Sequence, residues 1–558
     1  MSANISQAIG ASIPNNTPHA VSVTLPTWEA TVGYEEGEKW VTDKMKSGYP
    51  RFFIHSKIQE LAAYLEEKYG REGEKVFIFP SYNVAKRCRE FIRNKSTKNP
   101  LPTIRILQIS TPKPKTKDEE TYRAEAKIAI VFLPESEWSI AKQYWQHSGE
   151  GISSRLGEYV LQELQITTAD PSKDNLEYQT FIEERFGRNL NLSFAQDAKL
   201  ALRSRIAGNL GEHQEQQETT AQKKNRGLKL CEDDVYLYPT GMAAIFNAHL
   251  VNISTNLPNA KSVCFGFPYV DTLNILKKFG PGVHFFGFGD NESLLELEEL
   301  LKSGERVQGF YCECPSNPLL KTPNLVKAKQ LADTYNFPII IDETVGNFLN
   351  IDVLPYADIL VSSLTKVFSG DSNVMGGSLV LNPNSRYYPA FKEYLNNNFE
   401  DLYWGEDAIY LERNSRDFEK RSVKVNQNSE IIVNLLQNSP LIKDIYYPSL
   451  NSSNTLEYYE KIKTPNGGYG GLISIVFHEP EAARCFFNAL NLSKGPSLGT
   501  NFTLCCPYAI LAHYTELDEV EKWGVDRNLV RISIGLEEST QLAQTFQDAL
   551  AVAAGSIN

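Results

Sequence analysis

Short apolar runs alternate with longer segments of helical pattern between Asp234 and Asn382. The apolar runs cover residues 262–267, 309–313, 339–342, 359–362 and 377–381. Strands and helices that alternate in this way form a mostly parallel sheet wrapped by helices, so an α/β fold is predicted for this part of the chain. Ligands of such sheets bind at the carboxyl ends of the strands. We therefore expect the functional site at that edge of the sheet.

The segments on either side of this region predict three parts in all. Residues 1–170 are expected to form an N-terminal arm and an extra α+β domain, residues 171–385 the large domain with an arm of its own, and residues 386–558 a small α+β domain. The first 20 residues are polar and are predicted to be disordered, and residues 21–28 are predicted to be an extended arm.

Hydrophobic periodicity predicts the elements of the two outer parts. In the N-terminal domain it predicts helices at residues 56–69, 83–93 and 137–147, and strands at residues 75–79, 104–109 and 127–133. In the small domain it predicts a long helix at residues 415–437 and strands at residues 442–447, 472–477 and 529–534.

The composition excludes several classes of function. Of the 558 residues, 42% are hydrophobic and 22% are charged, and the net charge is −12. The negative charge argues against general nucleic-acid binding, and the sequence contains no apolar stretch of membrane-spanning length. The first basic residue is Lys39, so the start lacks the features of a presequence or a secretory signal, and a cytoplasmic location is expected. The eight cysteines and eight histidines have no metal-ligand spacing, and no metal is expected.

One lysine follows an apolar run in the segment Val361-Ser-Ser-Leu-Thr-Lys366. Burial at a strand end favours the neutral amine of Lys366, and a neutral amine can form a Schiff base. Ser363 and Thr365 could hydrogen-bond a phosphate, so the segment suggests pyridoxal 5'-phosphate (PLP) as cofactor. Taken alone, the segment fits a surface lysine after a strand better.

Three other segments support the cofactor hypothesis. Asp342 ends an apolar strand, where a carboxylate could keep the pyridine nitrogen of PLP protonated, although a helix N-cap is the plainer interpretation. Gly241 and Met242 lie in a turn between a strand and a helix, and helix N-terminal amides bind phosphate, although many such turns look alike. Asn317 is held between two prolines and could face the ring hydroxyl, or simply belong to a rigid turn.

In this order, the four motifs resemble those of the Cys/Met-metabolism family of PLP enzymes, from about residue 180 to the C-terminus. That family contains cystathionine γ-synthases, cystathionine lyases and O-acylhomoserine sulfhydrylases. The long fungal cystathionine γ-synthase-like members, which have an extra N-terminal region, are the most similar group. The resemblance implies fold type I, in which a large aspartate-aminotransferase-like domain is followed by a small domain. It also implies a homodimer or homotetramer with active sites between subunits.

The resemblance also implies roles for individual residues. Gly241 and Met242 match the phosphate turn, and Ser363 and Thr365 match two further phosphate ligands. Tyr269 matches the tyrosine that stacks on the ring, Asn317 the ligand of the ring hydroxyl, Asp342 the partner of the ring nitrogen and Lys366 the Schiff-base lysine. In the small domain Arg531 matches the arginine that holds the substrate α-carboxylate, with Ser497 assisting. Without the resemblance, Arg531 would be a partly exposed arginine on a strand.

Two segments compete for the family's Tyr-x-Arg phosphate clamp. Tyr49-Pro50-Arg51 carries both side chains, whereas Arg185 lies at the expected distance before Gly241 but has Glu183 in place of the tyrosine. We favour Arg185 because its downstream context is continuous and arginine suits bidentate phosphate binding.

Three residues depart from the family pattern. Phe502 stands in place of a glutamate, Asn373 in place of an aspartate and Glu343 in place of an asparagine. These departures put the substrate preference in doubt more than cofactor binding.

The reaction that the resemblance implies is γ-replacement on an O-acylhomoserine by a thiol. Cysteine as the thiol would give cystathionine, and sulfide would give homocysteine. Cystathionine lyase chemistry is a further alternative. A hypothesis of another class is a weakly active member with a regulatory or scaffolding role, suggested by Phe502 and by the displaced Tyr-x-Arg motif.

Overall fold

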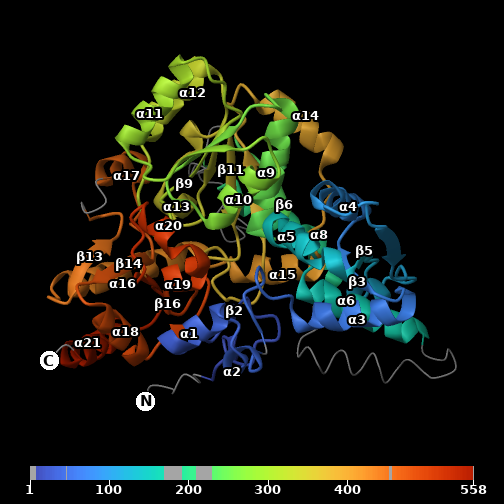
Figure 1. Ribbon diagram of the computed structural model, residues 1–558, viewed down its shortest axis with the longest axis horizontal. Helices are drawn as coiled ribbons and strands as arrows, with labels where there is room; N and C mark the ends of the chain where they lie inside the picture. Colours follow the sequence, from blue (N-terminus) through green and yellow to red (C-terminus); the bar gives the residue numbers. More distant parts are fainter. Residues whose placement is uncertain are drawn as a thin grey trace, which may run out of the picture.

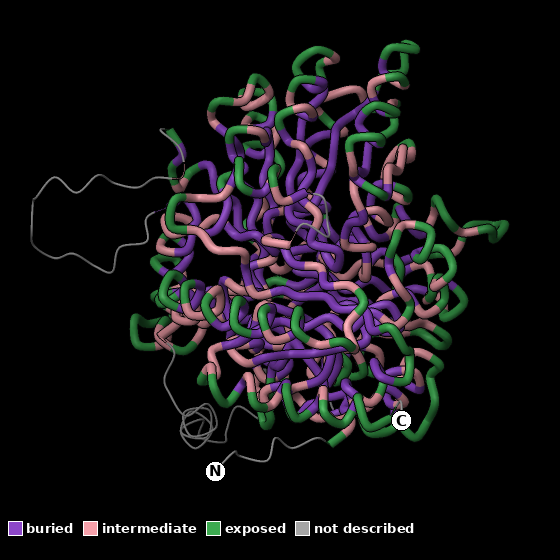
Figure 2. The backbone as a smooth tube through the Cα atoms, turned by 90° about the vertical axis from the view of Figure 1, so that its left-hand side faces the viewer, coloured by how far each residue is buried: buried purple, intermediate pink, exposed green. Residues whose placement is uncertain are grey.

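A computed structural model describes residues 8–45, 47–168, 191–208, 226, 229–450 and 455–556. Its larger sheets lie in three regions of the molecule (Figure 1). The N-terminal domain lies at the right of that view, the large sheet at the top centre and the small domain at the lower left. Figure 2 shows buried strands running through the interior while exposed residues lie on loops and outer helix faces.

The N-terminal domain is built on a three-stranded antiparallel sheet in the order β3-β5-β4. Its strands are β3 (Glu74–Phe79), β4 (Arg105–Ser110) and β5 (Lys127–Pro134), and its main helices are α3 (Ser56–Tyr69), α4 (Tyr82–Lys95), α5 (Trp138–Ser148) and α6 (Ser154–Thr168). Phe77 and Phe79 pack with α4 and α5, whereas Val76 and Ile78 pack with α3 and α6. Helices cover both faces, so the central strand β5 is apolar at nearly every position rather than at alternate ones.

The large sheet has seven strands in the order β6-β12-β11-β10-β9-β7-β8. Its strands are β6 (Val235–Tyr238), β7 (Ser262–Phe265), β8 (Val283–Phe286), β9 (Phe310–Glu313), β10 (Ile339–Asp342), β11 (Ile359–Ser363) and β12 (Gly377–Leu381). Only β12 runs antiparallel to its neighbours, so the prediction of a mostly parallel sheet is confirmed.

Helices cover both faces of this sheet. One face packs against α9 (Gly241–Thr255), α10 (Val270–Lys278) and α14 (Tyr388–Asn398), and the other against α8 (Ala195–Ile206), α11 (Asn291–Lys302), α12 (Leu325–Tyr335) and α15 (Gly405–Asn414). Along β9, Tyr311 faces the first group, and Phe310 and Cys312 face the second. This alternation follows the two-residue period of a strand.

The small domain contains a five-stranded sheet in the order β13-β14-β17-β16-β15. Its strands are β13 (Ile442–Tyr446), β14 (Leu472–Phe477), β15 (Ser493–Lys494), β16 (Leu504–Pro507) and β17 (Val530–Ser533), and its helices include α16 (Phe418–Gln437), α17 (Leu456–Ile462), α18 (Pro480–Ala489), α19 (Tyr508–His513), α20 (Leu517–Glu521) and α21 (Ser539–Gly555). Residues of α16, α18 and α21 pack on one face of the sheet and form a core with β14 and β17.

The prediction of disorder for the first 20 residues is wrong for residues 8–20. There β1 (Ser12–Ile13) pairs with β2 (Ser22–Val23), and the Gly10 amide donates to the carbonyl of Thr24. The arm continues into α1 (Trp28–Glu35) and α2 (Lys39–Thr42), and Trp28 joins the small-domain core. Because these residues bury apolar side chains against another domain, their polar composition did not reveal that they are ordered.

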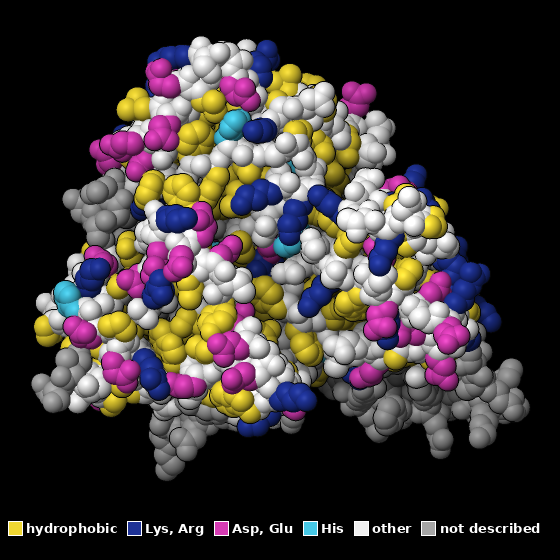
Figure 3. Space-filling model, viewed as in Figure 1, with side chains coloured by type: hydrophobic (Ala, Val, Ile, Leu, Met, Phe, Trp, Pro, Cys, Tyr) yellow, Lys and Arg dark blue, Asp and Glu magenta, His cyan; other side chains and the backbone are white. Residues whose placement is uncertain are grey.

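Charged side chains of both signs are interspersed on the face seen in Figure 3. Within the described residues, no helix combines the length and the apolar character that crossing a membrane requires.

Candidate active site

A cavity of about 190 Å³ lies at the carboxyl ends of β9, β10 and β11. Residues of all three parts of the chain line it. The large domain contributes Tyr269, Asn317, Asp342 and Lys366, the small domain Ser497 and Arg531, and the N-terminal part Tyr49, Arg51 and Arg155. The position agrees with the general rule for ligand sites of open α/β sheets.

Lys366 lies in the turn that follows β11, and only 8% of its surface is exposed. Its Nζ donates hydrogen bonds to Oη of Tyr49 at 2.9 Å and to Oγ of Ser497 at 2.8 Å. The Lys366 carbonyl accepts from the amide of Gly370 at 2.8 Å, which closes the turn. Segments far apart in the sequence therefore hold the amine inside the cavity.

Asp342 ends β10, directly beside the strand that precedes Lys366. Its Oδ1 accepts hydrogen bonds from the amide of Thr344 at 2.9 Å and from its hydroxyl at 2.5 Å. Both bonds end on the same oxygen, and burial raises the pKa of this carboxyl to about 6. A buried cation, such as a protonated ring nitrogen, would stabilise the ionised form of this carboxyl.

The turn before α9 brings helix N-terminal amides to the cavity. Thr240 caps the helix, and its Oγ1 accepts from the amide of Ala243 at 2.9 Å. A Cβ atom on Gly241 would lie 2.6 Å from Cβ of Ser363, so only glycine allows this close approach. The hydroxyl of Thr365, expected at the phosphate, instead contacts Gly376: it accepts from the amide at 3.2 Å and donates to the carbonyl at 3.4 Å.

Asn317 and Arg531 are in direct contact. Nη1 of Arg531 donates to Oδ1 of Asn317 at 3.0 Å, and Nη2 donates to the carbonyl of Ser497 at 2.7 Å. The residue expected at the cofactor ring thus touches the residue expected at the substrate carboxylate. Glu313 supports this corner, because its Oε2 accepts from the amides of Tyr269 at 3.1 Å and Asn317 at 3.2 Å.

The two candidates for the Tyr-x-Arg clamp differ in what the structure says about them. Tyr49 and Arg51 both line the cavity, and Cζ of Arg51 lies 4.5 Å from the ring centre of Tyr269. Arg51 also pairs with Asp271. Arg185 lies outside the described residues, so our preference for it stays a prediction.

The N-terminal domain adds residues that sequence reasoning did not assign to the site. Arg155, at the start of α6, lines the cavity and donates to Oδ1 of Asp407 at 3.0 Å and to the carbonyl of Asn373 at 2.7 Å. His19 and His55 line the same cavity. The only signal in the sequence is the glycine- and serine-rich loop at residues 149–154 before α6, a pattern that is typical of a plain helix cap and could also meet an anion.

The departures from the family pattern have local partners. Glu343 forms a buried ion pair with Arg226, and the backbone of Asn373 accepts the bond from Arg155. Phe502 is not part of the cavity lining.

The described residues include no group of three or more His, Cys, Asp or Glu side chains placed to hold a metal ion.

The lining residues fit PLP. Lys366 offers an amine for the aldehyde, Asp342 a carboxylate for the ring nitrogen, and the N-terminus of α9 offers amides for the phosphate. One further observation points to an anion: Nε of Arg51 is buried and has no hydrogen-bond partner among the described residues. A phosphate in the cavity would supply the missing acceptor.

Fold and site therefore define a PLP-dependent enzyme of fold type I. Two family models match the chain: the Cys/Met metabolism PLP-dependent enzyme at residues 220–551, and the fungal trans-sulfuration enzyme N-terminal domain at residues 57–153. This chain belongs to the Cys/Met-metabolism family of PLP-dependent enzymes and carries the N-terminal domain of its fungal trans-sulfuration members. The expected family, fold class and cofactor are confirmed.

Individual relatives resemble the whole chain. A cystathionine γ-synthase of Saccharomyces cerevisiae is 46% identical, with 99% of this chain and 100% of the relative covered. One of Neurospora crassa is 45% identical, with 98% of each chain covered. The crystal structure of a Xanthomonas oryzae pv. oryzae cystathionine γ-synthase in complex with cystathionine matches with a TM-score of 0.53 and 22% identity, over 65% of this chain and 98% of that one. The last comparison bears on the fold alone.

Proposed function

We propose that this protein catalyses γ-replacement on an O-acylhomoserine with cysteine as the thiol, giving cystathionine. The bond between Cγ and the ester oxygen breaks, the acyl group leaves as a carboxylate, and the cysteine sulfur bonds to Cγ and gives up its proton. Two full-length relatives that carry the name cystathionine γ-synthase support this reaction.

The observation that carries the proposal is the position of Ser497 between two functional groups. Its hydroxyl accepts from Nζ of Lys366 at 2.8 Å, and its carbonyl accepts from Nη2 of Arg531 at 2.7 Å. An amine that moves protons and a guanidinium that binds a carboxylate are thus joined through one residue. An α-amino acid held by Arg531 would present its Cα to Lys366.

Each residue has a stated task in this reaction. When bound, PLP supplies an aldehyde that links to the substrate amine and a ring that accepts electrons from Cα. Arg531 holds the α-carboxylate with its planar fork, and Lys366 moves the protons at Cα and Cβ. Asp342 keeps the ring nitrogen protonated, and Tyr269 packs against the ring. The amides at Gly241 and Met242, with Ser363 and an arginine, hold the phosphate.

The roles of the three parts of the chain are also proposals. We propose that residues 171–385 bind the cofactor, residues 386–558 bind the substrate carboxylate and residues 1–170 close the site. A homodimer or homotetramer in the cytoplasm is the expected state, by analogy with the family.

A substrate panel tests the proposal. Purified protein with added PLP is incubated with O-acetyl- or O-succinylhomoserine and with either cysteine or sulfide, and products are identified by mass spectrometry. Cystathionine should form from one of the esters with cysteine, and the Lys366→Ala variant should form none. Homocysteine from sulfide alone would indicate a sulfhydrylase, and cleavage of added cystathionine would indicate a lyase. PLP binding without any turnover would favour a regulatory or scaffolding role.

A further inference from the structure

A second cavity, with a volume of about 1120 Å³, lies between the N-terminal domain and the large domain. Residues of α4, α5, α9 and α14, the loop after α5, the turn after α10 and the segment after α14 line it. We call it the interdomain cleft, and the lining residues that matter below include Arg87, Lys95, Glu150, Asn247 and Lys278. Sites for small molecules usually have volumes of about 300–1,000 Å³, so the cleft has room for an organic ligand.

The interdomain cleft carries more positive than negative charge. Lys86, Lys95 and Lys278 line it, and none of them forms an ion pair with a described Asp or Glu. The three carboxylates of the lining have other partners, which are arginines for Glu90 and Glu150 and the side chains of Ser81 and Asn83 for Glu400. In Figure 3, Lys and Arg side chains gather near the centre of the face shown, where Figure 1 places α10 and α5. Among the described residues, three ammonium groups of the lining therefore lack an ionic partner, against one carboxylate.

Lys278 is partly buried at the end of α10. Burial, followed by the charges of Lys95 and Lys277, lowers the pKa of its ammonium group. Its Nζ donates to Nε2 of His147 at 2.7 Å, and burial lowers the pKa of His147 to about 3, so this partner is a neutral imidazole. A neutral acceptor leaves the repulsion between the lysines in place. An anion in the cleft would offset that repulsion and stabilise the charged form of Lys278.

Aromatic rings form another part of the lining. Phe279, Tyr394 and Phe399 are half-buried, so part of each ring is accessible. Tyr238 lines the cleft as well, and its buried hydroxyl has no hydrogen-bond partner among the described residues. The cleft thus combines apolar surface with a few polar and charged groups, as sites for organic ligands do.

Helix α9 separates the interdomain cleft from the active-site cavity. Near the start of the helix, Met242 and Ile245 line the cavity, whereas Ala243, Phe246 and Asn247 line the cleft. The two groups lie on different faces of the helix, as its period of 3.6 residues requires. Ligands in the two sites would therefore contact the same turns of one helix from different sides.

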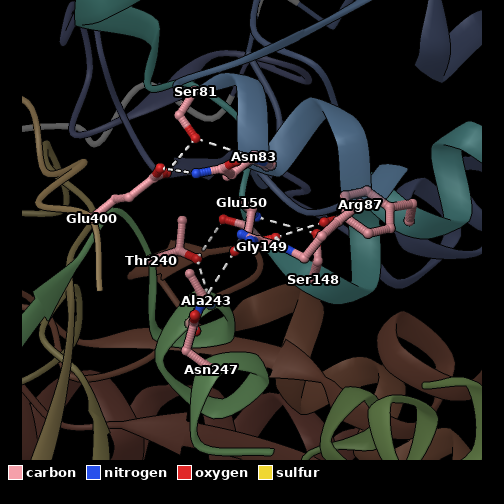
Figure 4. A network of polar contacts seen from close by, with 12 residues as sticks. Ser81, Asn83, Arg87, Ser148, Gly149, Glu150, Thr240, Ala243, Asn247 and Glu400 are labelled. Atoms are coloured by element: carbon pink, nitrogen blue, oxygen red, sulfur yellow. Dashed lines mark hydrogen bonds and ion pairs between the residues drawn. The ribbon is translucent and has the colours of Figure 1, made fainter. Parts of the chain in front are cut away.

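A polar network also joins the two sites (Figure 4). Nδ2 of Asn247 donates to Oε1 of Glu150 at 3.3 Å, and Arg87 pairs with the same carboxylate. The residue before it, Gly149, accepts through its carbonyl from the hydroxyl of Thr240, which caps α9. A ligand that contacts Arg87 or Asn247 would therefore act on the turn expected to hold the PLP phosphate.

We propose that the interdomain cleft binds a small organic phosphate and that this binding changes the affinity of the active site for PLP. The phosphate lies at the lysines, and a body that contains a ring lies against the aromatic side chains. Lysine binds phosphate as a compact point charge, and a phosphate dianion can neutralise two ammonium groups where a carboxylate neutralises one. Inorganic phosphate has the charge but no body to contact the rings.

The first test measures binding to the PLP-loaded protein by isothermal titration calorimetry. The probes are ATP, AMP, glucose 6-phosphate, inorganic phosphate and, as the unphosphorylated match for AMP, adenosine. We expect at least one organic phosphate to bind about 10-fold or more tightly than inorganic phosphate and adenosine, and to bind less tightly as the salt concentration rises. Binding of none of the organic phosphates, or equally tight binding of inorganic phosphate, would overturn the proposal.

Lysine variants locate the site. Lys95→Gln and Lys278→Gln should each weaken binding of the tightest organic phosphate about 5-fold or more, because each removes a positive charge from the lining. Lys113→Gln is the matched control, since it removes the same charge from the N-terminal domain outside the cleft. Full affinity in both cleft variants would overturn the proposal. Lys95 is exposed, so its variant keeps the test decisive if Lys278→Gln fails to fold.

A cofactor titration tests the coupling. The apoprotein is titrated with PLP in the presence and absence of that organic phosphate, and the visible absorbance of the bound cofactor gives Kd. We expect Kd for PLP to change about 5-fold or more in the wild type and to stay constant in the Lys95→Gln/Lys278→Gln double variant. An effect that persists in the double variant would indicate competition at the PLP phosphate site, and no effect in either protein would indicate independent sites. Either result would overturn the coupling.

These measurements separate the inference from the proposed reaction, because none of them uses turnover. A failed substrate panel would contradict the reaction and leave the interdomain site standing, whereas absence of organic phosphate binding would contradict the interdomain site alone.

Discussion

Oγ1 of Thr240 donates a 2.9 Å hydrogen bond to the carbonyl of Gly149, 91 residues earlier in the chain (Figure 4). The same hydroxyl caps α9, so the N-terminal domain touches the turn expected to bind the cofactor phosphate. Gly149 has a φ of 65°, and a Cβ there would lie 2.4 Å from Cβ of Met242. Next to it, Glu150 accepts from Nη2 of Arg87 at 2.5 Å and from Oη of Tyr144 at 2.6 Å. The extra domain is therefore part of the support of the active site.

Thr240→Val should lower both the stability of the protein and its affinity for PLP. The variant loses the cap of α9 and the bond to Gly149, and loss of an N-cap alone costs about 1 kcal/mol. A lower melting temperature and a weaker affinity for PLP are expected, measured by thermal unfolding and by cofactor titration.

Asp290→Ala provides the matched control, because Asp290 caps α11 by accepting from the amide of Ser293 at 2.9 Å, away from the cavity. It should lower the melting temperature and leave PLP affinity unchanged. Equal effects of the two variants on PLP affinity would show that the Thr240 contact has no special role.

The elements could be predicted from the sequence where packing on both sides fixes the pattern. β12 and β14 lie at the expected residues 377–381 and 472–477, because each is a short, mostly apolar run bounded by turn residues. β8 was missed, since its residues Val283–Phe286 are only half-buried at the sheet edge. The antiparallel direction of β12 was not predicted, because an apolar run has the same pattern in either direction.

In the candidate site, too, some residues follow from the sequence pattern and others are brought in only by tertiary packing. Asp342 and Lys366 could be found because they follow neighbouring strands, and the ends of parallel strands meet at one edge of a sheet. Tyr49 reaches Lys366 through tertiary packing across 317 residues, a distance over which the sequence contains no positional rule. Our preference for Arg185 relied on its continuous downstream context, and continuity along the chain carries no information about a segment that returns to the site from a separate domain.

Arg155 and Asp407 form an ion pair between the N-terminal domain and α15, with side chains 5% and 4% exposed. Arg155→Met should destabilise the protein by about 3–5 kcal/mol, because the change leaves a buried carboxylate unpaired. The double variant Arg155→Met/Asp407→Leu should recover most of that loss, as measured by denaturant unfolding.

The less buried pair of Arg105 and Glu74 is the comparison, with side chains 27% and 12% exposed. Arg105→Met should change the stability by about 1 kcal/mol or less. If the double variant at Arg155 and Asp407 were as unstable as the single one, the cost would come from lost packing and not from the unpaired charge.

Arg531→Ala should impair substrate binding and spare the cofactor. Arg531 is 6% exposed, and its hydrogen bonds to Asn317 and Ser497 end on neutral oxygens, which leaves its charge for a carboxylate. We expect KM for the amino-acid substrate to rise about 100-fold, with unchanged PLP absorbance. Loss of the absorbance would mean that Arg531 supports the cofactor instead. Arg527→Ala is the control, because this arginine pairs with Glu521 on the surface of the same domain.

Glu313→Gln should become relatively more stable than the wild type as the pH rises. Burial, followed by the charge of Asp342, raises the pKa of Glu313 well above its usual value. The folded state then retains a proton that the unfolded state releases above about pH 4.5, so wild-type stability falls as the pH increases from there. Glutamine cannot ionise, and its carbonyl can still accept from the amides of Tyr269 and Asn317.

Melting temperatures of both proteins between pH 5 and pH 8 check this prediction. A constant difference across that range would contradict it. Glu298→Gln should leave the difference constant over that range, because hydrogen bonding to Lys327 lowers the pKa of Glu298 and its contribution changes only below about pH 5.

In the cofactor-free protein the pKa of Tyr49 should be well below that of an ordinary tyrosine. Burial raises its pKa, but the charges of Lys366 and Arg51 and the hydrogen bond from Lys366 outweigh burial and lower it to about 8. An unperturbed tyrosine titrates near pH 10. The ultraviolet absorbance of tyrosinate should therefore show one early step, equivalent to a single residue of the 27 tyrosines.

Tyr49→Phe should remove this step, and Lys366→Ala should move it to higher pH because the nearest positive charge is gone. A step that persists in Tyr49→Phe would belong to another tyrosine and would contradict the contact between Tyr49 and Lys366.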